Sequence, residues 1–354
     1  MMPTRPIRLL IVDDSALVRE ILSTGLAKDP GIQVVGTASN PYEARDKIVQ
    51  LRPDVLTLDV EMPRMDGVEF LRKLMPQFPI PVVMVSSLTE SGKKITFDAL
   101  EAGALDFVSK PRSNVAAGLS SMLMELSTKV KLASTVDVSH WKGKRVERGA
   151  RGPIQSSALE ESTDKVVAIG ASTGGTEAIK EVITRFPVTM PGVIIVQHMP
   201  AGFTKMFADR LNSLSPMMVK EAENGDRIMA GRVLVAPGGK QMRVVRRGGI
   251  YQVEVKPGEP VMGHCPSVEV MMQSVAKEVG KNAVGVMLTG MGSDGCTGMK
   301  AMADAGALCV AQDEATSVVF GMPKEAYARG GAKKLVPLGD MAQTVINMVN
   351  RLAA

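Results

Sequence analysis

The chain has 354 residues, of which 45% are hydrophobic and 22% charged. This length accommodates two domains of ordinary size, and the composition excludes a disordered chain, a collagen-like repeat or a coiled coil. The net charge is +5, and the segment from His140 to Gly152, with five Lys/Arg and one Glu, supplies +4 of it. Aromatic residues make up only 3% of the chain. Nucleic-acid binding is therefore excluded as the main function, because it needs a broad basic face with aromatics that stack on bases.

The chain contains three cysteines, Cys265, Cys296 and Cys309, without C-x-x-C spacing. An odd number without this spacing indicates neither a disulfide framework nor a zinc site, and it favours the reducing cytoplasm. No apolar run approaches the roughly 18 residues that a membrane span needs, and the apolar stretch near the N-terminus is too short for a signal peptide. We therefore expect a cytoplasmic protein with no direct membrane insertion.

Short β-branched runs alternate with amphipathic helical patterns in the first third of the chain. Strands are predicted over 7–12, 32–38, 55–59, 81–86 and 104–110, and helices over 15–28, 41–51, 67–75, 96–103 and 114–132. Such alternation is typical of a parallel sheet wrapped by helices, here a flavodoxin-like, doubly wound α/β domain of five strands over residues 5–126. In this architecture the ligand site lies at the carboxyl ends of the strands.

A segment rich in Ser, Thr, Gly, Lys and Arg, residues 127–160, is predicted to be a linker. A second α/β series follows over residues 161–354. Its strand-like runs lie at 166–170, 192–197, 283–289, 307–312 and 334–338, with three hairpin-like runs between them at 232–237, 242–247 and 251–255. These runs indicate a second doubly wound, mostly parallel sheet with a β-hairpin insertion.

An acidic cluster is expected at the strand ends of the first domain. Asp13 and Asp14 directly follow the first strand, and Asp59 ends the third. One such acid alone often only caps a helix, but clustered carboxylates repel one another unless a cation joins them, and a small all-oxygen site suits Mg²⁺. Ser86 and Lys110 end the fourth and fifth strands, where a hydroxyl and an ammonium would suit a phosphoryl group.

These residues stand in four motifs, DD, LDVEMPRMDG, MVSS and SKP, whose order and spacing resemble the receiver domain of response regulators. The resemblance implies that Asp59 is the phosphoacceptor. It further implies a Mg²⁺ site formed by Asp14, Asp59 and the backbone carbonyl of Glu61 with help from Asp13, and recognition of the phosphoryl group by Ser86 and Lys110.

The second domain begins with a candidate nucleophile. Ser172 lies at the centre of a G-x-S-x-G turn between a strand and a helix, the context that projects a serine hydroxyl from a tight turn. A plain helix cap or an anion-binding loop explains such a turn equally well. Of the three histidines, His140 lies in the linker and His264 in a Gly/Pro-rich loop. His198, at the end of the strand over 192–197, is the best-placed candidate base, although a strand-end histidine is often only a polar loop residue.

The acid that orients this base is expected in the loop after the strand over 283–289, at Asp294. The same loop also fits G-x-G-x-x-G, with Asp313 near the place of a ribose-binding acid, so a nicotinamide-dependent enzyme is the main alternative. That alternative leaves the serine turn and His198 unexplained. The chain order Ser172, His198, Asp294 differs from that of α/β-hydrolases, chymotrypsin and subtilisin, but a triad is defined by roles and not by order.

The stretches IGASTGG, VQHMP, APGG, HCPSVEVMM, LTGMGSDG and QDEATSVVFGMP make residues 161–354 similar to the catalytic domain of CheB-type protein-glutamate methylesterases. The resemblance implies Ser172 as nucleophile, His198 as general base, Asp294 as its orienting acid, and an oxyanion hole from the backbone N–H groups of Thr173 and Met291. It assigns no catalytic role to His264. Cys296 has neither a helix-start position nor an adjacent base in the sequence, so a small apolar role is expected for it.

The residues themselves predict acyl transfer in two steps, by an esterase or an amidase. The resemblance implies more: demethylation of glutamyl methyl esters on chemoreceptors, deamidation of certain receptor glutamines, phosphorylation by a chemotaxis histidine kinase, and Mg²⁺ for receiver phosphorylation but no cofactor for the esterase step. It also implies that the unphosphorylated receiver obstructs access to Ser172. A receiver joined to a binding scaffold without enzymatic activity is the remaining alternative.

Overall fold

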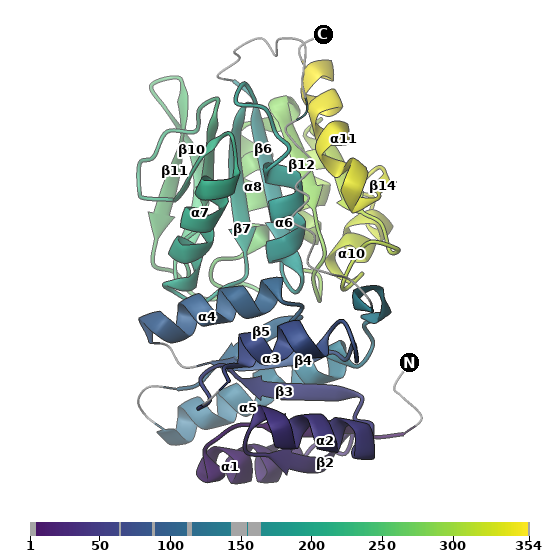
Figure 1. Cartoon of the computed structure of the whole chain (residues 1–354). Coiled ribbons are helices and arrows are strands. Elements are labelled where there is room, and N and C mark those ends of the chain that lie inside the picture. Colours follow the sequence, from purple (N-terminus) through teal and green to yellow (C-terminus); the bar gives the residue numbers. More distant parts are fainter. Residues whose placement is uncertain are drawn as a thin grey trace. The chain divides into compact units, whose positions relative to one another are not determined.

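The computed structural model of the chain describes residues 5–63, 65–86, 89–111, 115–142, 154 and 164–352, without the side chains of 90–94, 115–117 and 140. It divides into two compact units, Met1–Arg148 and Gly149–Ala354 (Figure 1). Within the described ranges, no helix has the length and apolar character needed to cross a membrane.

The first unit contains a five-stranded sheet in the order β2-β1-β3-β4-β5, in which every neighbouring pair is parallel. The strands are β1 (Ile7–Val12), β2 (Ile32–Ala38), β3 (Val55–Asp59), β4 (Val82–Ser86) and β5 (Asp106–Ser109). β3 and β4 are buried at every position, as expected of strands covered by helices on both faces. This arrangement confirms the predicted flavodoxin-like fold.

In the described part of this unit, five helices connect and cover these strands: α1 (Ala16–Leu26), α2 (Pro41–Leu51), α3 (Gly67–Leu74), α4 (Glu90–Glu101) and α5 (Val115–Ala133). α1 packs against α5, while α3 packs against both α2 and α4, so the helices form two layers. Side-chain caps begin three of them, because Ser15, Asn40 and Asp66 each accept a hydrogen bond from an amide of the first turn. A 3₁₀ turn, η1 (Ser139–Trp141), follows α5.

The second unit contains a seven-stranded sheet in the order β14-β13-β12-β6-β7-β9-β8, again parallel throughout. Its strands are β6 (Val166–Ala171), β7 (Gly192–Gln197), β8 (Met218–Glu221), β9 (Arg232–Val235), β12 (Ala283–Met287), β13 (Leu308–Gln312) and β14 (Leu335–Val336). The predicted doubly wound, mostly parallel sheet is therefore confirmed.

The middle of this unit differs in part from the prediction. β10 (Gln241–Arg247) and β11 (Ile250–Lys256) do form an antiparallel hairpin, whose turn is Gly248-Gly249 with both φ angles positive. The prediction was wrong for the first hairpin-like run, since β9 belongs to the parallel sheet between β7 and β8. The last three residues of β9 are buried, so its pattern fits an interior strand better than a hairpin arm.

The helices of the second unit form two groups. α6 (Gly175–Ile183) packs against α7 (Phe203–Leu214) and α11 (Leu338–Arg351), whereas α8 (Val268–Glu278) packs against α9 (Cys296–Asp304) and the hairpin strand β10. α10 (Met322–Ala328) lies against α9, and a 3₁₀ turn, η2 (Gly280–Asn282), follows α8. The apolar core between sheet, hairpin and α8 joins Met242 and Val253 of the hairpin to Met271 and Val275 of α8.

The domain boundaries proposed from the sequence, at 126 and 161, stay a prediction. α5 continues to Ala133, seven residues beyond the first boundary. Most of the basic run from His140 to Gly152 lies outside the described residues.

Candidate functional site

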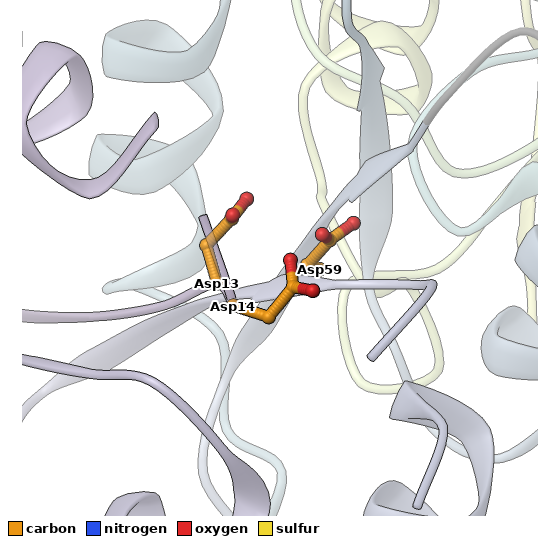
Figure 2. A group of neighbouring side chains, drawn as sticks. All are labelled: Asp13, Asp14 and Asp59. Carbon is orange, nitrogen blue, oxygen red and sulfur yellow. The ribbon is translucent and has the colours of Figure 1, made fainter. Parts of the chain in front are cut away.

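Three carboxylates meet at the carboxyl edge of the first sheet. Asp13 and Asp14 follow β1, Asp59 ends the neighbouring β3, and one oxygen from each lies within 4.8 Å of the others (Figure 2). Asp13 and Asp59 are buried, whereas Asp14 is exposed. Three carboxylate oxygens at this separation, open to solvent on one side, match a small divalent cation that keeps part of its water shell. The residues present therefore fit Mg²⁺.

Lys110 supplies the positive charge in this pocket. It follows β5, and its Nζ lies 2.9 Å from Asp13 Oδ2 and 2.9 Å from Asp59 Oδ2. Burial raises the pKa of Asp59 to about 6; Lys110 opposes this effect, while Asp13 adds to it. Burial alone would lower the pKa of Lys110, but the two carboxylates raise it, so the ammonium stays charged.

Ser86 and Glu61 complete the set predicted for this pocket. Ser86 ends β4, and its carbonyl accepts a hydrogen bond of 2.8 Å from the Lys110 amide, so the two residues lie side by side. The Ser86 hydroxyl also accepts a 2.6 Å bond from Thr96 of α4. Glu61 lies two residues beyond Asp59, with its side chain exposed and 3.4 Å from the Thr89 hydroxyl. Ser86 thus lies beside Lys110 and contacts α4 through its hydroxyl.

We expect the affinity of the pocket for Mg²⁺ to rise with pH through about 6. The cation and the proton compete for Asp59, whose pKa in the metal-free protein is about 6. Below that pH the apparent affinity should fall by up to about tenfold per pH unit, and above pH 7 it should be constant. Calorimetric titration with Mg²⁺ at pH 5, 6 and 7.5 measures this. Asp59→Asn should bind Mg²⁺ more weakly, and its affinity should no longer change near pH 6. Equal Mg²⁺ affinities of the unmodified chain at pH 5 and pH 7.5 would contradict the prediction.

A second group of polar residues lies at the carboxyl edge of the seven-stranded sheet. Ser172 follows β6 and His198 follows the neighbouring β7, and the His198 amide donates to the carbonyl of Ala171 at 3.3 Å. The side-chain amide of Gln197 donates to the carbonyls of Ser172, at 2.9 Å, and His198, at 3.3 Å. The strand ends therefore hold Ser172 and His198 next to one another, as the shared sheet edge predicts.

Asp294 reaches the same edge from the other side of β6. It lies in the loop after β12, is 2% exposed, and places Oδ2 2.8 Å from Nε2 of His198. Nδ1, the other ring nitrogen of His198, is buried and has no hydrogen-bond partner among the residues that the structure describes. An imidazole whose Nε2–H binds a carboxylate leaves Nδ1 as a proton acceptor.

The Asp294 carboxylate is held by the start of α8, which sequence reasoning did not anticipate. Ser267, the N-cap of that helix, donates its hydroxyl to Oδ1 at 2.7 Å, and the amides of Val268 and Glu269 donate at 2.7 and 3.1 Å. Burial by itself would raise the pKa of Asp294, but hydrogen bonds from His198, Ser267 and Val268 lower it below its usual value. The available signal was Ser267 directly before an apolar helical run, with Glu269 in its first turn, because both features are typical of a helix N-terminus and helix N-termini bind anions.

Gly290, the first glycine of the loop at 290–295, packs closely against Ser172. A Cβ on Gly290 would lie 2.9 Å from the Ser172 Cβ and 2.4 Å from the Met322 sulfur. Thr289 fixes the loop further, because its hydroxyl donates to the Thr173 carbonyl at 3.0 Å and accepts from the Val319 amide at 2.9 Å. Thr173 is buried next to Ser172 in the chain, and Met291, 43% exposed, follows Gly290.

Asp313 has a local structural contact instead of a place in this group. Its carboxylate accepts hydrogen bonds from the amide and the hydroxyl of Thr316, at 3.1 and 2.5 Å. It therefore caps the turn after β13.

Cys296 begins α9, so the expectation that it has no helix-start position was wrong. The small apolar role predicted for Cys296 nevertheless agrees with the structure. The side chain is fully buried, and burial raises the pKa of the thiol to about 12. A thiol with that pKa is not a nucleophile near neutral pH.

Two models of known protein families match this chain, one in each of its two units. The model of the CheB methylesterase family matches residues 167–345, and that of the response regulator receiver domain matches residues 9–117. The chain is 68% identical over 347 residues to a protein-glutamate methylesterase/protein-glutamine glutaminase of Syntrophotalea carbinolica, with 98% of each chain covered. The chain belongs to the CheB methylesterase family.

Two further relatives support this membership. A protein of the same description from Salmonella typhimurium is 49% identical over 345 residues, with 97% of each chain covered. The crystal structure of the Thermotoga maritima CheB methylesterase catalytic domain covers 52% of this chain and 98% of its own, at 35% identity and a TM-score of 0.51. Family membership confirms the two predicted modules and removes both the nicotinamide-dependent alternative and the non-enzymatic scaffold.

Proposed function

We propose that the chain hydrolyses glutamyl methyl esters on chemoreceptors and deamidates certain receptor glutamines, with Ser172 as nucleophile, His198 as general base and Asp294 as its orienting acid. The observation that carries the proposal is the 2.8 Å contact between His198 and Asp294 beside Ser172 at neighbouring strand ends. The relatives from Syntrophotalea carbinolica and Salmonella typhimurium are both described as protein-glutamate methylesterase/protein-glutamine glutaminase.

In the first step, Nδ1 of His198 accepts the proton of the Ser172 hydroxyl while its oxygen attacks the side-chain carbonyl. The negative charge that forms on the carbonyl oxygen needs donors already in position, and we assign the backbone N–H groups of Thr173 and Met291 to this oxyanion hole. His198 then returns the proton to the leaving group. An ester releases methanol, an amide releases ammonia, and the glutamyl group stays bonded to Ser172.

In the second step, water attacks this acyl-enzyme. His198 takes a proton from the water, the ester bond to Ser172 breaks, and the serine oxygen recovers its proton. The receptor side chain leaves as a glutamate. Asp294 favours the imidazolium that forms twice in the cycle, and its lowered pKa keeps it ionised throughout. No cofactor takes part in these steps.

A serine-directed fluorophosphonate tests the nucleophile directly. The full chain should be labelled once, Ser172→Ala should not be labelled, and Ser213→Ala is the control, because Ser213 is an exposed residue of α7. Labelling of Ser172→Ala at the rate of the unmodified chain would overturn the assignment.

We further assign Asp59 as the phosphoacceptor of the receiver domain, with a chemotaxis histidine kinase as donor. Asp13, Asp14, Asp59 and the Glu61 carbonyl would hold Mg²⁺, which supplies charge neutralisation when bound. Lys110 would balance a further negative charge on the phosphoryl oxygens, and Ser86 would bind one of them. The three unpaired cysteines support a place in the cytoplasm.

We expect the unphosphorylated receiver to restrain the esterase. A fragment beginning at Glu161 should hydrolyse esters faster than the unphosphorylated full chain and should not respond to a phosphodonor. For a coupling of about 1–3 kcal/mol, phosphorylation should raise the activity of the full chain roughly 5- to 150-fold. Steady-state hydrolysis with and without a small acyl phosphate measures both effects. Phosphorylated full chain that greatly exceeds the fragment would instead indicate activation by positive contact.

A further inference from the structure

His264, to which the family resemblance assigns no catalytic role, lies directly on the ring of His198. The two ring centroids are 3.6 Å apart and the ring planes differ by 11°, so the imidazoles are stacked face to face. Asp294 binds the edge of the same ring at Nε2. His198 therefore has one partner on its edge and one on its face.

The turn that presents His264 is tightly built. Val261 and His264 exchange both backbone hydrogen bonds, each at 3.0 Å. The two residues between them, Met262 and Gly263, have φ angles of 52° and 83°. Two positive φ angles are typical of a type I′ turn, which leaves the flanking backbone little freedom. The histidine is thus held by backbone geometry rather than by a flexible loop.

Gln241 ties this turn to the scaffold. Its side-chain nitrogen donates to the His264 carbonyl at 3.2 Å, and its side-chain oxygen accepts from the Ser267 amide at 2.9 Å. Ser267 in turn donates its hydroxyl to Asp294 at 2.7 Å. One short segment of chain, residues 264–267, therefore holds both the ring above His198 and the carboxylate at its edge.

We propose that His264 is a positioning residue of the hydrolytic reaction, which fixes the plane of the His198 ring and with it the direction in which the buried Nδ1 points. The inference rests on the proposed function. The hydrogen bond at Nε2 restricts rotation of the imidazole about its Cβ–Cγ bond only in part, and a ring stacked on its face restricts that rotation further.

Three variants of the full chain test the positioning role of His264 by ester hydrolysis. The substrate is p-nitrophenyl acetate, and a small acyl phosphate and Mg²⁺ are present to phosphorylate the receiver. His264→Leu removes the aromatic face and should lower kcat by about 2- to 12-fold with KM unchanged, the rate equivalent of a stacked aromatic pair. His264→Phe restores a flat aromatic ring and should keep kcat within about twofold. Tyr327→Leu is the control: it removes an aromatic ring from α10 at a residue that is 48% exposed, and it should leave kcat unchanged.

The same changes in a His198→Ala background test whether His264 acts through His198. There His264→Leu should have no further effect, because the ring that it positions is gone. In spectra of histidine-labelled protein, the ring protons of His198 should shift in His264→Leu and move back in His264→Phe, independently of turnover. The positioning role would be overturned if His264→Leu lowered kcat by the same factor in the unmodified chain and in His198→Ala. It would also be overturned if His264→Phe lowered kcat as much as His264→Leu does.

Two different outcomes distinguish a wrong role for His264 from a wrong function for the chain. If Ser172→Ala is inactive while His264→Leu equals the unmodified chain in kcat and in the His198 spectrum, only the role of His264 is wrong. If Ser172→Ala retains full turnover, the proposed function itself fails.

Discussion

Ser172→Ala should lower the turnover of a glutamyl methyl ester by about 10⁴- to 10⁶-fold, and His198→Ala should do the same. Without the hydroxyl no acyl-enzyme forms, and without the imidazole the hydroxyl keeps its proton. Methanol release from methyl-esterified receptor, measured on the phosphorylated full chain, gives the rates. Ser213→Ala should match the unmodified chain.

Asp294→Asn should lower turnover by about 10⁴-fold, because it removes the charge that favours the imidazolium but keeps the shape of the side chain. When Ser172→Ala, His198→Ala and Asp294→Asn are combined, the losses of turnover should not add, because members of one catalytic unit fail together. Independent, multiplying losses in Ser172→Ala combined with His198→Ala would show that the two residues do not act in one step.

Asp59→Asn should abolish phosphoryl incorporation from a small acyl phosphate, and excess chelator should abolish it in the unmodified chain. The attacking carboxylate and the phosphodonor are both anionic, and their repulsion is overcome only when a cation joins them. Incorporation of labelled phosphate, followed by mass spectrometry of the modified peptide, measures the result. Asp46→Asn, at an exposed acid of α2, is the control and should behave as the unmodified chain. Phosphorylation of Asp59→Asn at the normal rate would place the phosphoacceptor elsewhere.

The positions of the polar residues along the strands could be predicted from the sequence. Strands that are apolar throughout belong to a parallel sheet with both faces covered, and the carboxyl ends of such strands meet at one edge. That rule places Asp13 and Asp59 at one edge and Ser172 and His198 at another. The strand order, which makes the members of each pair neighbours, comes from the structure. The sequence could not exclude the nicotinamide alternative, because the glycines at 290–295 fit a phosphate-binding loop and a packing loop equally.

Only the tertiary structure decided how the base is surrounded. His198 and Asp294 are 96 residues apart in the chain, and Ser267 and His264 reach them from a third segment beyond the hairpin. No periodicity in a single segment reports such contacts, because they depend on how α8 and its preceding turn pack on the sheet. Local pattern thus determined which residues stand at the strand ends, whereas long-range packing determined which nitrogen of His198 faces Asp294 and which ring covers it. The physical reason is that the end of a buried strand can be read from where its local apolar run stops, while side-chain orientation in a site follows from hydrogen bonds and stacking between distant segments.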